Sequence, residues 1–402
     1  MTTEQFISLE DTYGASNYKP LDIILSKAKG VWVWDIDGNR YLDCVAAYSA
    51  VNHGHCHPKI LNVIKEQAER LALISRAFRT DQIGPFSEQI CKLSESQKVL
   101  FMNSGAEAVE TALKAVRKWG YAHKGVDEGK AEIIVCDENF HGRTIAIVGF
   151  SSIEKYRHGF GPFPPGFKSI PFGDAGAFEA AITKNTVGFM VEPVQGEGGM
   201  NVPPDGYLAK IREIATDKNV ALVFDEVQCG LGRTGRLFAE DHESVRADVM
   251  VIGKSLGGGF VPISAVLARG DVLDVFGPGE HGSTFGGNPL ACAVGRVSLE
   301  VMEEEALIAN AQKIGDIIQR RLLPRIGSTI KSIKGRGLMI GIELMDEAGE
   351  AGAFASKLAS FGLLCNAASN HVLRFTPPLT ILEEEIDWAL ERLEAGLDSI
   401  AS

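Results

Sequence analysis

The chain has 402 residues, of which 45% are hydrophobic and 23% are charged, with a formal net charge of −12. Its length suits two domains, or one large α/β domain with a satellite. The composition excludes disordered, collagen-like and membrane-embedded chains. The acidic balance and the absence of a long Lys/Arg run argue against nucleic acid or an anionic membrane as the main partner.

The seven cysteines are spread along the chain without a C-x-x-C pair. This pattern predicts neither a disulfide framework nor a structural zinc site. No segment approaches the roughly 20 apolar residues that span a bilayer. The first residues form neither a secretory signal nor an Arg-rich presequence, so we expect a cytoplasmic protein.

The first regular elements are two alternating apolar runs around Asp37-Gly38, which predict a hairpin over 31–43. Apolar runs then alternate with helical periods up to about residue 330. This alternation predicts an α/β fold with a mostly parallel sheet covered by helices. The expected strands are 133–136, 187–191, 221–224 and 249–252, and the expected helices are 105–119, 205–217 and 290–303. Segment 159–166 is expected to be an ordered loop anchored by Phe160, Phe163 and Phe167.

After Pro289 the helical pattern continues to residue 323. Two expected strands, 335–344 and 372–375, then flank a helix at 351–361, and 383–400 forms the last helix. These elements predict a smaller α/β domain. We therefore expect an N-terminal segment 1–46 that belongs to the small domain, a large cofactor-binding domain at 47–290, and a C-terminal small domain at 291–402.

Two apolar runs end in residues that can perform chemistry. Strand 221–224 leads into Asp225, at the carboxyl end of a strand where ligands bind in open α/β sheets. Capping of the following turn is the alternative role for Asp225. Strand 249–252 leads to Lys254 and a run of glycines, where reduced solvation makes an amine nucleophilic toward an aldehyde. Taken singly, a lysine is more often a surface residue.

A helix start and an aromatic-basic cluster add candidate ligand contacts. Ser104 and Glu107 fit a capping box, and Gly105 and Ala106 expose free amides that suit a phosphate, although capping alone also explains the pattern. The segment 140–143 combines an aromatic ring, an imidazole and a guanidinium. Phe140 could cover a flat ring, and Arg143 and Arg374 could anchor carboxylates; singly, either arginine is more often in a structural ion pair.

Other motifs in the chain lack the context that their chemistry needs. The G-x-G-x-x-G match at 230–235 does not open a clean helix and is interpreted as a loop. Gly253-Lys254-Ser255 resembles the end of a P-loop, but Asp248 stands at the required glycine. The alternating histidines of 53–57 have no completing cluster, so no metal site is expected.

Taken together, these residues resemble the class III aminotransferases of the type I PLP-dependent transferase fold over nearly the whole chain. Within that family, several long stretches look like the ornithine aminotransferases. These stretches are 13–14, 17–18, 47–52, 75–78, 118–121, 159–163 and 279–284. The resemblance implies pyridoxal 5′-phosphate (PLP) as the cofactor and a large domain with a mostly parallel sheet plus a smaller α/β domain.

The resemblance also implies roles around the cofactor. Lys254 would bind PLP covalently and move the substrate proton, and Asp225 would pair with the pyridine nitrogen so that the ring accepts electrons. Phe140 would stack on the ring, and Gln228 would bond its phenolic oxygen. The phosphate would be held by Ser104, Gly105 and Ala106, and by Ser283 and Thr284 of the neighbouring subunit, so the resemblance implies a homodimer.

On the substrate side, the resemblance implies that Tyr18 and Arg143 hold the α-amino and carboxylate end of ornithine while Glu197 neutralises Arg374. When 2-oxoglutarate or glutamate binds, Glu197 would release Arg374 for the α-carboxylate and Arg143 would take the distal carboxylate. Tyr48, where acylornithine enzymes carry glycine, would favour free ornithine.

Two supporting positions complete the implied site. Glu192 would position Gln228 or the wall of the active site. His141 differs from the tryptophan of the animal ornithine enzymes and matches the histidine of the wider class.

The implied reaction transfers the terminal amino group of L-ornithine to 2-oxoglutarate, giving glutamate and glutamate 5-semialdehyde, which cyclises to pyrroline-5-carboxylate. N-acetylornithine and 4-aminobutyrate are the alternative donors. Other classes are a PLP aminomutase, which needs no oxo acid, and a catalytically dead binding protein, which the presence of Lys254 and Asp225 disfavours. A nicotinamide oxidoreductase would rest only on the glycine motif.

Overall fold

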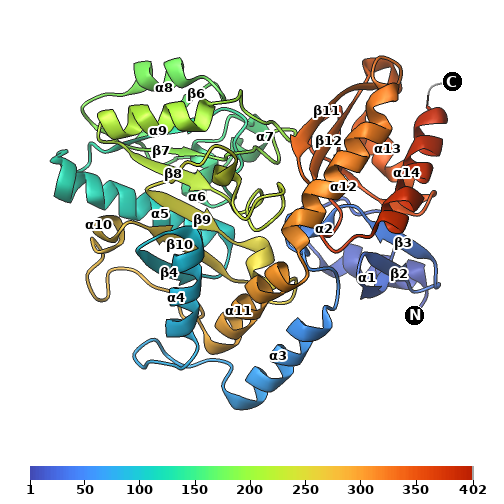
Figure 1. Cartoon of the computed structure of the whole chain (residues 1–402), viewed down its shortest axis with the longest axis horizontal. Helices are drawn as coiled ribbons and strands as arrows, with labels where there is room; N and C mark the ends of the chain where they lie inside the picture. Colours follow the sequence, from blue (N-terminus) through green and yellow to red (C-terminus); the bar gives the residue numbers. More distant parts are fainter. Residues whose placement is uncertain (401–402) are drawn as a thin grey trace.

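The computed structural model describes residues 1–400, and its centre is a seven-stranded sheet in the order β4-β10-β9-β8-β7-β5-β6 (Figure 1). All strands run parallel except β10, which is antiparallel to both neighbours. Their bounds are β4 Lys98–Met102, β5 Glu132–Cys136, β6 Phe167–Ile170, β7 Thr186–Val191, β8 Ala221–Asp225, β9 Val249–Ile252 and β10 Ser264–Ala268. Strands β7 and β8 at its centre are nearly continuous apolar runs because helices bury both faces of the sheet.

Helices cover the two faces of this sheet, each over its own apolar core. One core joins the sheet to α5 (Gly105–Trp119), α6 (Ile145–Gly149) and α10 (Gly270–Leu273). The other joins it to α8 (Ala175–Ala181) and α9 (Tyr207–Asp217). The expected strands and the helices at 105–119 and 205–217 are confirmed to within a few residues, because their apolar periods match burial on a sheet.

Two smaller sheets lie beside the large one. The first, in the order β1-β2-β3-β13, contains β1 (Leu25–Lys29), β2 (Trp32–Asp35), β3 (Arg40–Asp43) and β13 (Leu363–Leu364). The second, in the order β11-β12-β15-β14, contains β11 (Ile330–Arg336), β12 (Met339–Leu344), β15 (Val372–Phe375) and β14 (Asn366–Ala367). The predicted hairpin is confirmed as β2 and β3, and Figure 1 shows these N-terminal strands beside the C-terminal elements.

The remaining helices pack around these sheets. Their bounds are α1 Thr3–Tyr13, α2 Ala46–Ser49, α3 Pro58–Arg70, α4 Ile83–Ser94, α7 Glu154–Arg157, α11 Pro289–Glu304, α12 Leu307–Leu322, α13 Ala351–Ala359 and α14 Glu383–Asp398. The largest apolar core joins α11 to α14 with both small sheets and part of the large one. The division at residues 46/47 and 290/291 stays a prediction, and the last two residues of its third part lie outside the described residues.

Three details of the predicted elements are wrong. The helix expected through residue 323 breaks into α11 and α12 at Ala306, which has φ 51°. Consecutive glutamates end α11, where the negative end of the helix dipole disfavours extension. The strand expected at 335–344 is a hairpin that turns at Gly337, with φ 54°. Phe160 is 57% exposed in this chain and does not anchor its loop.

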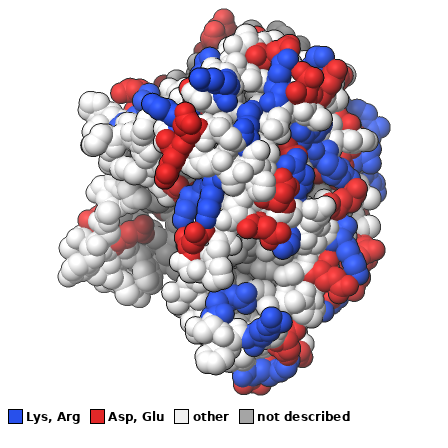
Figure 2. Space-filling view, turned by 90° about the vertical axis from the view of Figure 1, so that its left-hand side faces the viewer, with Lys and Arg blue, Asp and Glu red and all other residues white. Residues whose placement is uncertain are grey.

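The surface mixes charges of both signs. On the face shown in Figure 2, acidic and basic side chains are interspersed. Ion pairs such as Lys210–Glu213 and Lys218–Asp217 join such charges along α9. Among residues 1–400, no helix has the length and apolar character needed to cross a membrane.

Gly188 in β7 tests the packing of α5 on the sheet. A Cβ at this position would lie 2.6 Å from Val116 Cγ1, so Gly188→Val overpacks the core. We expect destabilisation of about 2 kcal/mol, seen as a thermal unfolding midpoint several degrees lower. Gly352→Val is the matched control, because nothing lies within 4 Å of a Cβ there. An equal loss of stability in both variants would contradict the packing argument.

Candidate active site

The candidate active site lies at the edge of the large sheet where the parallel strands end. Strands β4, β5, β7, β8 and β9 all point to this edge, because β10 alone runs the other way. The segments that follow them meet around a cavity of about 180 Å³. Its lining includes the predicted residues Gly105, Ala106, Phe140, His141, Glu192, Asp225, Gln228 and Lys254. Parallel strand direction thus brings together residues as far apart in the chain as Gly105 and Lys254.

The carboxyl group of Asp225 is held in place by two contacts. Its Oδ2 lies 2.6 Å from His141 Nδ1, and its Oδ1 accepts a hydrogen bond from the amide of Val227 at 3.0 Å. Burial disfavours the charged imidazole, but the hydrogen bond with Asp225 and the charges of Asp225 and Glu192 outweigh burial and raise the pKa of His141. His141 therefore supports the carboxylate directly, a contact that the sequence alone did not indicate.

Lys254 follows β9 and begins a short 3-10 turn with a left-handed backbone, φ 46°. Burial lowers the pKa of Lys254 to about 8, with the charge of Glu197 opposing this shift and that of Arg374 adding to it. A substantial fraction of the amine is therefore neutral at mildly alkaline pH. A neutral amine is the form that attacks an aldehyde.

The start of α5 offers an anion site next to Lys254. The predicted capping box is confirmed: Glu107 N donates to Ser104 Oγ at 3.2 Å, and Ser104 N donates to the Glu107 carboxylate at 2.8 Å. The amide of Ser104 is thereby occupied. Helix geometry leaves the amides of Gly105 and Ala106 without intrahelical partners, at the positive end of the dipole.

Gln228 and Glu192 form one wall of the cavity. Gln228 Nε2 is buried and has no hydrogen-bond partner among the described residues. A Cβ at Gly196 would overlap Gln228 Oε1, so the amide group packs directly against that glycine. Glu192 accepts hydrogen bonds from Phe140 N at 3.1 Å and Gly196 N at 3.4 Å, and burial raises the pKa of Glu192 to about 7. Glu192 thus bonds Gly196, which packs against Gln228, and does not bond Gln228 itself.

A second cavity of about 530 Å³ contains the predicted substrate residues Tyr18, Tyr48 and Arg143. Arg143 has no ion pair or hydrogen bond among residues 1–400; its guanidinium lies 5.6 Å from the ring centroid of Phe140 and 4.8 Å from that of Tyr156. Phe140 lines the first cavity, so the two cavities adjoin at this contact. Sequence reasoning missed Tyr156, since its place beside Arg143 arises from the fold and no motif marks it.

The predicted pair of Glu197 and Arg374 is present. Arg374 Nη2 donates to Glu197 Oε1 at 2.6 Å, and its guanidinium lies 4.8 Å from the centroid of the Tyr48 ring. Arg374 is fully buried, and its Nε and Nη1 have no hydrogen-bond partner among the described residues. The guanidinium is neutralised but only partly hydrogen-bonded, so it retains donors for a carboxylate.

Tyr48 sits on a strained turn. The four consecutive residues of α2 have positive φ angles: Ala46 46°, Ala47 46°, Tyr48 59° and Ser49 73°. A left-handed backbone costs about 1–2 kcal/mol for each residue with a side chain. Asp43 Oδ1 holds the entry to the turn by accepting from Val45 N and Ala46 N, both at 2.9 Å. Strain of this kind is typical of functional positions.

Two other groups of residues lie outside these cavities. Ser283 and Thr284 line a separate cavity of about 720 Å³ next to Phe285, and Ser283 Oγ accepts from Asn103 Nδ2 at 2.8 Å. Their contact with a neighbouring subunit stays a prediction. The alternating histidines bind different partners: His53 bonds Ser298 O, His55 pairs with Asp43 and His57 with Glu305.

Comparisons with known proteins place this geometry in a family. Residues 13–397 match the family model described as aminotransferase class-III. The chain is 54% identical over 385 residues to an ornithine aminotransferase from Bordetella pertussis, covering 96% of this chain and 93% of that protein.

Solved structures share the same fold. An ornithine aminotransferase from Toxoplasma gondii with PLP at partial occupancy in its active site matches with a TM-score of 0.96 and 44% identity, covering 99% of this chain and 95% of that one. An acetylornithine aminotransferase from Elizabethkingia anophelis matches with a TM-score of 0.90 and 41% identity, covering 99% and 100%.

The lowered pKa of Lys254 predicts how the cofactor-free chain takes up PLP. We expect the rate of covalent uptake, followed by the visible absorption of bound PLP, to rise about tenfold per pH unit below 8 and to level off above it. Lys254→Ala is the control and should show no such band. A rate that keeps rising tenfold per unit between pH 8 and 10 would mean that the amine has its ordinary pKa.

Proposed function

The chain belongs to the class-III aminotransferase family, and we propose that it transfers the terminal amino group of L-ornithine to 2-oxoglutarate with PLP as its cofactor. The products are glutamate 5-semialdehyde and glutamate. The observation that carries the proposal is the pair of arginines at the two adjoining cavities: Arg143 lines the second cavity with no ion pair among residues 1–400, and Arg374 is buried against Glu197. Such a site can bind one carboxylate or two.

The residues of the first cavity fit PLP. The unpartnered Nε2 of Gln228 would donate to the phenolic oxygen, and the free amides of Gly105 and Ala106 would hold the phosphate. Phe140 would cover one face of the ring. Asp225, supported by His141, would hold a proton on the pyridine nitrogen. When bound, PLP supplies an aldehyde that takes up amino groups and a ring that accepts electrons.

In this proposal, Lys254 binds the cofactor and transfers the proton. Its amine would hold the cofactor covalently until an amino substrate displaces it, and it would then move a proton at the reacting carbon of the substrate. The partly neutral amine fits both tasks, because a general base works best with a pKa near the working pH.

The two arginines would serve the two half-reactions in turn. In the first, Tyr18 and Arg143 would bind the α-amino and carboxylate end of ornithine, placing its terminal amine near Lys254, while Glu197 keeps Arg374 neutralised. In the second, the α-carboxylate of 2-oxoglutarate would displace Glu197 from Arg374, and Arg143 would bind the distal carboxylate. A bidentate arginine–carboxylate pair suits both positions.

A homodimer is part of the proposal. Thr284 and Ser283 would contact the phosphate in the neighbouring subunit. The cavity that they line, together with the exposed apolar side chain of Phe285 in its wall, supports a subunit contact on this side of the chain. The cytoplasmic location stays a prediction from the sequence.

N-acetylornithine is the second candidate donor, because the chain also resembles the Elizabethkingia anophelis enzyme over nearly its whole length. The position of Tyr48 argues against it. Its ring lies between Arg374 and the cavity of Tyr18 and Arg143, where an acyl group on the α-amine would need room.

The substrate assignment is tested by the absorption spectrum of the PLP-loaded chain. Ornithine is expected to bleach the visible band of bound PLP, and 2-oxoglutarate is expected to restore it. N-acetylornithine should act at least tenfold less efficiently, because in this proposal Tyr18 binds the free α-amino group, which the acyl group would block, and the Tyr48 ring lines the same cavity. Equal bleaching by both donors would refute the preference for ornithine, and the absence of a visible band would refute the PLP function.

The role of Glu197 is tested by Glu197→Ala. Freeing Arg374 should raise kcat/KM for glutamate about tenfold and lower it for ornithine by a similar factor, as expected for one charged hydrogen bond. Steady-state rates with each donor measure the ratio. Glu213→Ala on the surface of α9 is the control and should leave both rates unchanged. An unchanged or reversed preference in Glu197→Ala would show that Glu197 does not mask Arg374.

A further inference from the structure

A second buried arginine, Arg233, differs from Arg374 in having no carboxylate partner among the described residues. Arg233 is fully buried in the loop that contains the glycine motif of 230–235, which has no role in the proposed site. Burial lowers the pKa of Arg233 to about 9 against the opposing charge of Asp43. A guanidinium without a carboxylate partner is costly to bury, so the hydrogen bonds of Arg233 indicate which segments it holds together.

The donors of Arg233 reach three segments that are distant in sequence. Nη1 donates to Leu338 O at 3.1 Å and to Pro377 O at 2.6 Å, and Nη2 donates to Asn52 Oδ1. Asn52 extends the network, since its side-chain Nδ2 donates to Leu231 O at 3.0 Å and its main-chain carbonyl accepts from Leu379 N at 2.8 Å. We call Arg233 and Asn52, with these bonds, the arginine clamp.

The segments that the clamp joins are those that carry the substrate anchors. Asn52 lies three residues after Ser49, the last residue of the strained turn of Tyr48, and Pro377 lies three residues after Arg374. Further bonds tie the same two segments to each other: Thr376 N donates to Cys44 O at 2.7 Å, and Thr376 Oγ1 donates to Val45 O at 3.1 Å. The contact of Arg374 with the Tyr48 ring thus lies between two segments that the clamp holds together.

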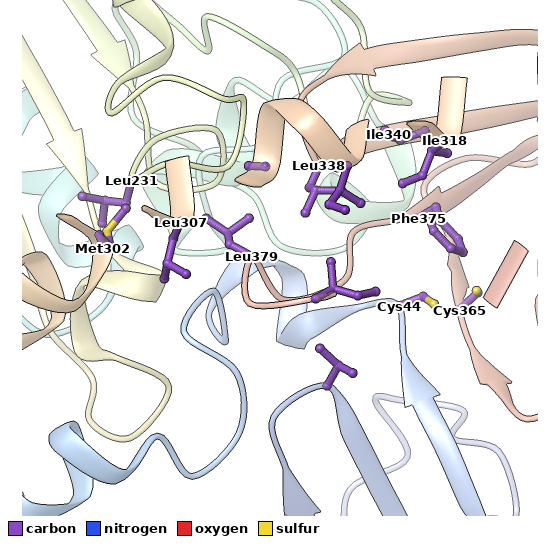
Figure 3. Packing of buried hydrophobic residues seen from close by; sticks show 14 of the residues in the cluster. Cys44, Leu231, Met302, Leu307, Ile318, Leu338, Ile340, Cys365, Phe375 and Leu379 are labelled. Carbon is purple, nitrogen blue, oxygen red and sulfur yellow. The ribbon is translucent and has the colours of Figure 1, made fainter. Parts of the chain in front are cut away.

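The surroundings of the clamp exclude other partners. Figure 3 shows Leu231, Leu338 and Leu379 in one apolar cluster, and the main chain of 233–235 packs within 2.9 Å of a Cβ placed on Gly337. Hydrogen bonds are stronger in such a medium, and an unpaired donor there is costly. Only a planar guanidinium has the forked donors to serve all three acceptors, which lysine cannot do in the same geometry.

We propose that Arg233, through Asn52 and the 377–379 segment, is a positioning residue that sets the place of Arg374 against the Tyr48 turn and so determines affinity for the 2-oxo acid. The proposal rests on the proposed function, in which Arg374 binds the α-carboxylate. Arg233 itself lines neither cavity of the site.

The test compares Arg233→Lys with Arg212→Lys in the full-length, PLP-loaded enzyme. Arg212 is the matched control: it is a partly buried arginine that pairs with Asp248 at 2.8 Å, remote from both cavities. We expect Arg233→Lys to raise KM for 2-oxoglutarate about tenfold, to change kcat less than threefold, and to leave the absorption band of bound PLP unchanged. Arg212→Lys should leave KM within twofold. A fall in kcat or stability with unchanged KM would overturn the positioning role.

Asn52→Ala keeps the proposal testable if Arg233→Lys does not fold. It removes the acceptor of Nη2 and should raise the same KM about threefold; an unchanged KM in this variant would overturn the proposal.

Hydrogen exchange gives a readout independent of the reaction. The clamp variants should speed exchange at 44–53 and 374–381, and Arg212→Lys should not; equal protection in all variants would also overturn it. If ornithine does not bleach the visible PLP band of the unaltered enzyme, the proposed function is refuted. The hydrogen-exchange result then tests the clamp by itself.

Discussion

The shared direction of the parallel strands is the constraint on which the site depends. Because β4, β5, β7, β8 and β9 end at one edge, the residues that follow them meet without any loop having to cross the sheet. Strands β7, β8 and β9 are fully buried, so their main chain is fixed by hydrogen bonds on both sides and by helices on both faces. Asp225 and Lys254 therefore leave rigid elements, which holds their separation constant.

Several charged side chains of the site are buried, and their hydrogen-bond partners differ. Asp225 has an imidazole and an amide, and Glu192 has two amides. Lys254 has no hydrogen-bond partner among residues 1–400, and burial lowers its pKa to about 8, just as burial raises the pKa of Glu192 to about 7. This difference assigns the chemistry: the compensated groups hold position, and the uncompensated amine reacts.

Arg374 and Arg233 show the same physics used for two purposes. Both are fully buried guanidinium groups. Arg374 has a carboxylate that a substrate can replace, and two of its nitrogens remain unpaired, so its partner can exchange. Arg233 bonds only carbonyl oxygens and an amide oxygen of the chain, so its partners cannot leave without loss of local structure. One arginine is arranged to switch partners and the other to remain bound.

The sequence by itself determined the class of fold and the residues at strand ends. Apolar runs predicted β5, β7, β8 and β9, and the Ser104–Glu107 spacing predicted the start of α5, because these signals depend on neighbours along the chain. The family resemblance supplied the substrate residues, whose motifs are local. Only the tertiary structure decided the contacts of His141 with Asp225, of Tyr156 with Arg143, and of Arg233 with Pro377. These pairs join segments that no local pattern relates, and long-range packing alone brings them within a few ångströms.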